Sequence, residues 1–187
     1  MDKCERCGTN EVKIILKDGA TSKRLCNNCY NEIMSDELGV DLEQLIESFS
    51  LKDYQGVSRT FYVERRLHPV GLYLEAAEDI KYGYKFAIHG ELDSNQTELL
   101  TKLIEKTRKG IHMQQVKSKL FPNGQAYNSI IHDQFTGIIE YDESSDGVPL
   151  IIIDGKPFAW EEVGKMLMTY EGFQIKVKMY DVTDDVD

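Results

Sequence analysis

The sequence predicts an α+β fold in which a small zinc finger precedes a mainly antiparallel sheet with two main helices. All four cysteines fall within the first 29 residues, as two Cys-x-x-Cys pairs. Beyond residue 56, segments rich in aromatic and β-branched residues alternate with turn residues and with two amphipathic segments. For a chain of 187 residues we expect a zinc finger over residues 1–38, a linker with a short helix over 39–56, an α+β domain over 57–180 and an acidic tail over 181–187.

The cysteine pairs have the spacing of a zinc site. A knuckle turn lets two thiolates that are two residues apart face one ion at about 2.3 Å, and a second pair completes the tetrahedron. We therefore expect one structural zinc ion, bound by Cys4, Cys7, Cys26 and Cys29. Disulfides are the alternative. The start MDKCERCG lacks the apolar core of a secretion signal, and reducing compartments disfavour structural disulfides.

The residues around the cysteines predict the rest of the finger. Apolar residues alternate over 12–17, Asp18-Gly19 supplies a tight turn, and residues 22–25 return toward the second pair, which predicts a β-hairpin. Tyr30, Ile33 and Met34 then recur at helical spacing, so we expect a helix from the second pair to Gly39.

This order of knuckle, hairpin and helix resembles a treble-clef or zinc-ribbon finger. The segment CERCG…LCNNCYNEI is similar to the N-terminal zinc-binding part of McsA-type proteins, activators of a bacterial protein-arginine kinase, over roughly residues 1–38. Residues 1–37 hold six basic and seven acidic side chains, and zinc with four thiolates adds about two negative charges. We therefore expect a structural or protein-contacting finger, with nucleic-acid contact and redox or metal sensing as alternatives.

The middle of the chain predicts a short helix, three strands and a long helix. Four apolar residues share one face of a helix within 39–56: Leu42, Leu45, Ile46 and Phe49. Strands are expected over residues 57–66, 69–75 and 84–91. An apolar stripe beyond the N-cap candidates at residues 93–95 predicts an amphipathic helix of about four turns that ends near Gly110.

The last third predicts further strands around one helix. We expect strands over residues 126–132, 135–141 and 149–153, the last one buried on both faces. A helix follows, with Trp160 and Tyr170 on its apolar face. Residues 173–180 then alternate apolar and polar residues, as a half-buried strand does. Trp160, Tyr170 and Phe173 are assigned to the core.

The segment DGKPFAWEEVGKMLMTYEGFQIKVKMYD resembles the C-terminal signature of an uncharacterised bacterial protein family. Members of that family often carry an N-terminal segment like a zinc ribbon. The resemblance implies a domain at this place and no particular chemistry.

Two pairs of polar residues are the candidates for catalysis. His89 and Glu91 match half of the zinc deaminase signature, but the P-C-x-x-C half does not follow them. His132 and Asp133 are adjacent, and neighbouring side chains in a strand point to opposite faces. We therefore assign no catalytic and no cofactor-binding residue.

The charge of the chain points to the class of partner. It has 22 Lys and Arg against 32 Asp and Glu, a net charge of -10, which repels phosphate backbones and anionic membranes. No apolar run approaches the length of a membrane span. We expect a cytoplasmic zinc-binding protein that acts through a protein partner with a basic surface. A hydrolase-like enzyme that uses polar residues of the larger domain, and a regulator whose finger contacts nucleic acid, are the alternatives.

Overall fold

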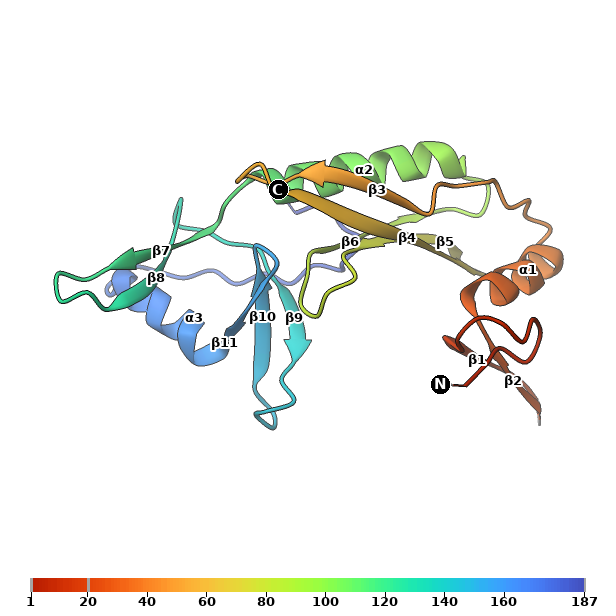
Figure 1. The fold of residues 1–187 in the computed structure, drawn as a ribbon, viewed down its shortest axis with the longest axis horizontal. Helices are drawn as coiled ribbons and strands as arrows, with labels where there is room; N and C mark the ends of the chain where they lie inside the picture. Colours follow the sequence, from red (N-terminus) through yellow and green to blue (C-terminus); the bar gives the residue numbers. More distant parts are fainter. Residues whose placement is uncertain (1, 20, 187) are drawn as a thin grey trace.

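The computed structural model describes residues 2–19 and 21–186, so Met1, Ala20 and Asp187 lie outside the described part. Figure 1 shows an elongated molecule: the cysteine hairpin lies at one end, a sheet covered by a long helix in the middle, and smaller sheets with a short helix at the other end. The α+β class is confirmed, because the described residues form three helices and sheets whose strand pairs are all antiparallel.

The elements follow one another along the chain as Figure 1 labels them. The helices are α1 (Asn27–Leu38), α2 (Gln96–His112), α3 (Trp160–Leu167) and the 3-10 turn η1 (Met168–Tyr170). The strands are β1 (Ile14–Asp18), β2 (Thr21–Leu25), β3 (Ser48–Lys52), β4 (Ser58–His68), β5 (Gly71–Ala77), β6 (Lys85–Gly90), β7 (Val116–Leu120), β8 (Ala126–Ile130), β9 (Ile138–Tyr141), β10 (Pro149–Ile153) and β11 (Lys156–Ala159).

The N-terminal hairpin and helix form as the sequence predicts. Strands β1 and β2 pair antiparallel, with Ile14 opposite Leu25. Helix α1 starts directly after Cys26 and ends at Gly39, whose φ of 66° is left-handed. Glycine adopts that conformation without the penalty a side chain brings, so it closes the helix where the periodic pattern stops.

The short helix expected within residues 39–56 is wrong. The chain is extended there and enters β3, which pairs with β4. Long-range hydrogen bonds take the place of helical ones: the carbonyl of Glu43 accepts from Arg65 Nη1 at 2.8 Å, and the carbonyl of Glu47 accepts from Val63 N. Leu42, Leu45 and Phe49 still pack on the core. Their apolar pattern therefore reflects burial and does not indicate a helix.

The middle sheet has the strand order β3-β4-β5-β6, and α2 packs against β5 and β6. Gly110 of α2 lies against Phe86, where an added Cβ would come within 2.2 Å of the ring, so only glycine lets helix and sheet approach this closely. The first core cluster joins finger and middle sheet through buried residues that include Cys4, Leu25, Tyr30, Met34, Phe61, Leu67, Leu72, Leu74, Leu100, Leu103 and Ile111.

The C-terminal third has a second core cluster of its own. It contains the buried residues Val116, Ile130, Ile151, Ile153, Phe158, Val163 and Met166. Strands β7 and β8 pair with each other, and β10 lies between β9 and β11. Strands β7 and β11 were not predicted. β8 ends at Ile130, before the predicted end at residue 132, because His132 and Asp133 adopt positive φ angles of 59° and 57° and break the extended chain. β9 begins at Ile138, three residues later than predicted.

The half-buried strand expected at residues 173–180 is also wrong. In the described part of the chain these residues belong to no helix and pair with no strand, and their side chains are exposed. Trp160 and Phe173, which we expected in the core, are 53% and 77% exposed, because the buried side chains of α3 are Val163 and Met166. Beyond this segment, Lys106 of α2 donates to the carbonyls of residues 182–184 at 2.6 to 3.3 Å.

Candidate metal centre

The first cysteine pair sits in a tight turn. The backbone N–H of Gly8 donates to the carbonyl of Cys4 at 2.9 Å, and Gly8 has a φ of 69°. The N–H of Cys4 donates to the carbonyl of Asn10 at 2.9 Å. This turn brings the sulfurs of Cys4 and Cys7 to one side, as a metal knuckle requires.

The second pair sits at the start of a helix. Cys26 is the N-cap residue of α1, and Cys29 lies in the first helical turn. The β1–β2 hairpin returns the chain from the first pair to the second, so local turns and one hairpin bring all four sulfurs together.

The four sulfurs form one compact group. All of their Sγ atoms lie within 4.8 Å of one another, and the Sγ atoms of Cys7 and Cys26 are 3.9 Å apart. A tetrahedral ion with sulfurs at about 2.3 Å has sulfur-to-sulfur edges of about 3.8 Å. Cys4, Cys26 and Cys29 are buried, and Cys7 is exposed. The four free thiols therefore have the spacing and the chemistry of a soft-metal site, which zinc fits.

The sulfurs differ in acidity. The backbone N–H of Asn10 and the hydroxyl of Thr9, which lies 3.3 Å from Cys7 Sγ, hold the pKa of the Cys7 thiol at about 5. The backbone N–H of Cys7 lowers the pKa of the Cys4 thiol. Burial, with the neighbouring sulfurs, raises the pKa of the Cys29 thiol to about 12. A cation among the sulfurs offsets this crowding of negative charge, because it favours the thiolate of every ligand.

Two polar residues that bond to the sulfurs were not predicted from the sequence. Thr9 donates to Cys7 Sγ, and Asn10 Nδ2 lies 3.7 Å from Cys26 Sγ. Their position directly after the knuckle is a signal that could have pointed to them, since polar groups next to metal ligands bond to those ligands and orient them.

Helix α1 fixes this cysteine site against the middle sheet. Asn31 is buried; its Nδ2 donates to the carbonyl of Arg65 at 2.7 Å, and its Oδ1 accepts from Leu67 N at 2.9 Å. Asn27 Nδ2 donates to Glu64 Oε2 at 2.7 Å. The side chain of Asn31 therefore continues the edge of β4 beyond the point where β3 stops pairing with it.

The residues considered for catalysis do not form a site. His89 lies on β6 and Glu91 follows it, whereas His132 and Asp133 follow β8 in the C-terminal third. Among residues 2–19 and 21–186, no hydrogen bond or ion pair joins any two of these four. Asp133 instead accepts from the hydroxyl of Tyr170 at 3.0 Å.

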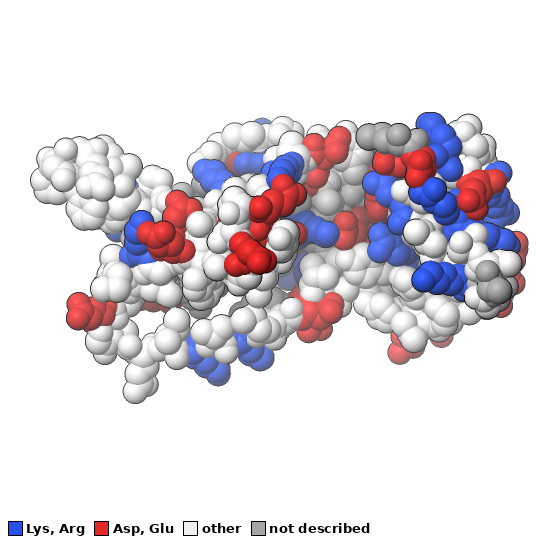
Figure 2. All heavy atoms as spheres, turned by 90° about the horizontal axis from the view of Figure 1, so that it is seen from below, with Lys and Arg blue, Asp and Glu red and all other residues white. Residues whose placement is uncertain are grey.

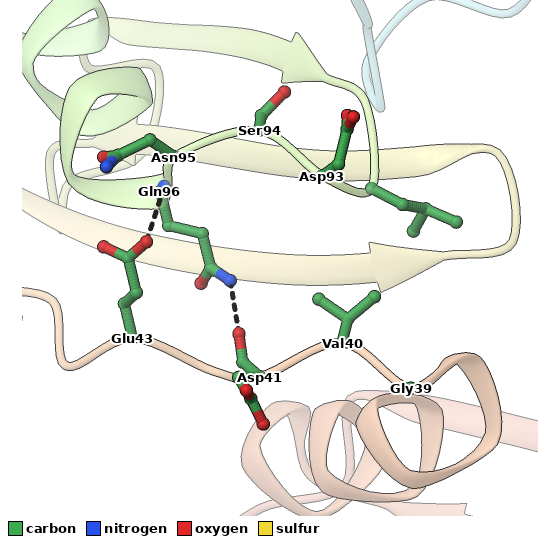
Figure 3. A pocket seen from close by; sticks show the side chains of 9 residues that line it. Gly39, Val40, Asp41, Glu43, Asp93, Ser94, Asn95 and Gln96 are labelled. Atoms are coloured by element: carbon green, nitrogen blue, oxygen red, sulfur yellow. Dashed lines mark hydrogen bonds between the residues drawn. The ribbon is translucent and has the colours of Figure 1, made fainter.

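An open pocket lies where the linker after α1 meets the start of α2 (Figure 3). Its volume is about 490 Å³. Glu43 reaches across and accepts from Gln96 N at 3.1 Å and from Thr97 N at 3.0 Å, and Gln96 Nε2 donates to the carbonyl of Asp41 at 2.7 Å. The chain's own carboxylate thus occupies the N-terminus of α2, the place where an anion would bind.

Three family models match consecutive parts of the chain, each of them described as a domain of unknown function. DUF7685 matches residues 3–41, DUF7686 matches residues 43–112, and DUF7713 matches residues 115–184. The chain is similar to three such domains in series. The matches meet between α1 and β3 and between α2 and β7. No curated protein and no solved structure matches the chain.

None of the helices in residues 2–19 and 21–186 is both long enough and apolar enough to cross a bilayer.

Proposed function

We propose that the chain is a zinc-stabilised interaction protein, in which one structural zinc ion holds the N-terminal finger and the remainder contacts a macromolecular partner. The observation that carries the proposal is the group of four cysteine sulfurs within 4.8 Å of one another. Four sulfurs complete the tetrahedral shell of zinc and leave no position for a substrate, so the ion has a structural role.

The place of the finger in the fold supports this role. Tyr30 and Met34 of α1 belong to the same core cluster as Leu67 and Leu74 of the middle sheet. A finger of this size buries too little core to be stable without its metal. The zinc ion therefore stabilises the finger and also holds helix α1 in the core of the middle sheet.

Metal analysis tests the zinc. Protein purified under reducing conditions should contain about one zinc per chain. Cys26→Ser should lose the metal, whereas Lys17→Ala, an exposed change in the same hairpin, should keep it. Two disulfides and no metal in the reduced protein would contradict the assignment.

The partner is proposed from charge. Outside residues 1–37 the chain holds 16 basic and 25 acidic residues, so nearly all of its excess negative charge lies beyond the finger. A field of this sign speeds the encounter with basic protein surfaces, and salt screens it over about 8 to 10 Å. Affinity purification with the full chain should retain a defined protein at low salt and release it as salt rises. Retention of nucleic acid alone would contradict a protein partner.

Contact of the finger with nucleic acid is the second candidate, and one observation favours it. Lys and Arg side chains gather at the finger end of the molecule in Figure 2, although Asp and Glu side chains lie between them. Lys13, Lys17 and Lys23 are exposed there, while Arg24 is paired with Asp2. Binding of a short DNA or RNA duplex that weakens with salt and is lost in a Lys13→Glu, Lys17→Glu double variant would support this candidate.

A further inference from the structure

The C-terminal segment 173–179 has the composition of a strand but lacks a partner strand. Its apolar side chains, those of Phe173, Ile175, Val177 and Met179, are between 68% and 77% exposed. They alternate with Gln174, Lys176 and Lys178. Within residues 2–19 and 21–186, no backbone hydrogen bond involves residues 174–180. Such a row of unpaired backbone groups beside exposed apolar side chains is a template for strand addition.

The same third of the molecule also presents a sheet edge. Strand β9 lies at the edge of the sheet β11-β10-β9. Its side chains Ile139 and Tyr141 are 54% and 68% exposed, and Glu140 lies between them. An edge strand has unpaired backbone N–H and C=O groups, so one with exposed apolar side chains can pair with a strand of another chain.

The two surfaces are complementary in charge and in apolar pattern. In an antiparallel pair with Met179 opposite Ile139, Val177 falls opposite Tyr141 on the same face. On the other face, Lys178 falls opposite Glu140 and Lys176 opposite Asp142. Residues directly opposite in antiparallel strands share a face, and apolar and opposite-charge pairs stabilise such a sheet.

The molecule also exposes more surface than a compact monomer does. Its accessible surface is 12619 Å². A compact monomeric protein of 21.5 kDa exposes about 9,200 Å². Much of the apolar part of this excess lies in the C-terminal third, where Trp160 and Met168 are also more than half exposed. An interface that covers this third would remove that excess.

We propose that two copies of the chain form a dimer by exchanging this strand: residues 173–179 of each copy add to the free edge of β9 in the other. Within one chain the segment is held at both ends, by the contact of Phe173 with Tyr170 and by the bonds of Lys106 to the carbonyls of residues 182–184. The second copy supplies the edge that the segment does not reach in its own chain. Because each copy gives a strand and receives one, the interface is two-fold symmetric and the assembly ends at two copies.

The apolar face is tested with a matched pair of variants. Val177→Asp places a charge in the proposed strand, and Val70→Asp makes the same change at a loop residue that is 81% exposed. Both residues are exposed in the monomer, so both variants should fold. In sedimentation equilibrium the wild-type chain and Val70→Asp should have the mass of a dimer, and Val177→Asp that of a monomer.

The charged face is tested with two charge-reversal variants. Glu140→Lys alone and Lys178→Glu alone each place like charges opposite one another in both halves of the dimer, which should weaken self-association by about tenfold. An equal mixture of the two variants should form a heterodimer, because both of its strand pairs again join opposite charges. The double variant should dimerise as the wild-type chain does.

Each contrary result overturns the proposal. A wild-type chain that stays monomeric at its highest soluble concentration excludes the dimer. If Val177→Asp dimerises like the wild-type chain, the interface lies elsewhere. If Lys178→Glu fails to associate while Glu140→Lys dimerises normally, the segment pairs with something other than β9. None of these results depends on the zinc site, so failure of the dimer leaves the proposed function standing.

Discussion

At the scale of residues, the buried side-chain amide of Asn31 bonds the finger helix to the middle sheet. Asn31 both donates to and accepts from the backbone of β4. Asn31→Asp keeps the size and the acceptor but turns a second oxygen toward the carbonyl of Arg65. We expect it to lower the free energy of unfolding by about 1–3 kcal/mol, the cost of a buried polar group without its partner. Urea unfolding measures the change. Asn28→Asp, an exposed change on the same helix, should have almost no effect.

A buried carboxylate gives the fold a dependence on acid. Asp53 accepts from Arg59 Nε at 2.7 Å and from the N–H groups of Gln55 and Val57. Burial alone would raise the pKa of this carboxyl, but the bond from Arg59 and the two N–H groups outweigh it, so the pKa lies below its usual range. A depressed folded-state pKa contributes stability above the unfolded value, near 3.9, and that stability is lost as the pH falls through the folded value.

We therefore expect Asp53→Asn to be less stable than the wild-type chain at pH 7. The gap between their free energies of unfolding should narrow as the pH falls below about 4. Urea unfolding at a series of pH values checks this. A gap that stays constant down to the acid transition would show that the carboxylate charge does not contribute.

At this scale, spacing alone predicted the cysteines, because a metal knuckle is a local structure that uses residues close in sequence. Asp53 has partners within six residues, Gln55, Val57 and Arg59, but its burial comes from the folded sheet and does not show in the local sequence. The role of Asn31 could not be predicted from spacing. Asn31 bonds to residues more than thirty positions away, and only the folded sheet brings its partners within reach.

At the scale of elements, helix α2 has two caps at its N-terminus. Asn95 caps it locally by accepting from Glu98 N, and Glu43 caps it from the linker. Glu43→Gln keeps the size and removes the charge that the positive end of the helix favours. We expect a lower melting temperature at pH 7. The hydroxyl of Thr97 and the N–H of Gln96 hold the pKa of Glu43 below the usual range of a glutamate pKa. The difference in melting temperature between the variant and the wild-type chain should therefore disappear only at a pH below that range.

Thermal unfolding followed by circular dichroism at pH 7 and pH 3 measures this effect. Glu47→Gln, the same change at an exposed side chain further along the linker, is the matched control. If the two variants melt alike at pH 7, Glu43 does not stabilise the helix through its charge.

The elements that the sequence predicted well are those with local signals. Helices α1 and α2 have a 3.6-residue apolar repeat and end signals, and β4, β5 and β6 have turn residues between them. The linker and residues 173–180 have apolar patterns too, but those patterns report burial or pairing that other parts of the fold must provide. The linker forms hydrogen bonds with β4 and α2, so it is extended and not helical. Residues 173–180 have the alternation of a strand but pair with no strand in the described part of the chain.

At the scale of the whole molecule, the described residues pack into two cores, and the finger shares the first one with the middle sheet. The sizes of the two parts expected from the sequence predict that serine at Cys26 and Cys29 would disorder the finger only, because a larger domain can fold by apolar burial alone. Because Tyr30 and Met34 pack in the core of the middle sheet, we now expect the loss of metal to reach β4, β5 and α2 as well. Strand β10 and helix α3, in the second core, should be unaffected.

Hydrogen exchange with mass spectrometry resolves the two regions. Peptides from residues 58–77 and 96–112 should exchange faster in Cys26→Ser, Cys29→Ser than in the wild-type chain, and peptides from residues 149–167 should exchange at the same rate. Faster exchange confined to the finger would show that the two structures fold independently.

The elongated arrangement in Figure 1 has a consequence for how the molecule moves through a solvent. A particle with its parts laid in a row experiences more friction than a sphere of the same mass. A single chain will therefore leave a gel-filtration column early and diffuse slowly, with the apparent size of a larger globule. Column calibration would therefore overestimate the mass of one copy, and methods that weigh the particle directly are needed to distinguish one copy from two.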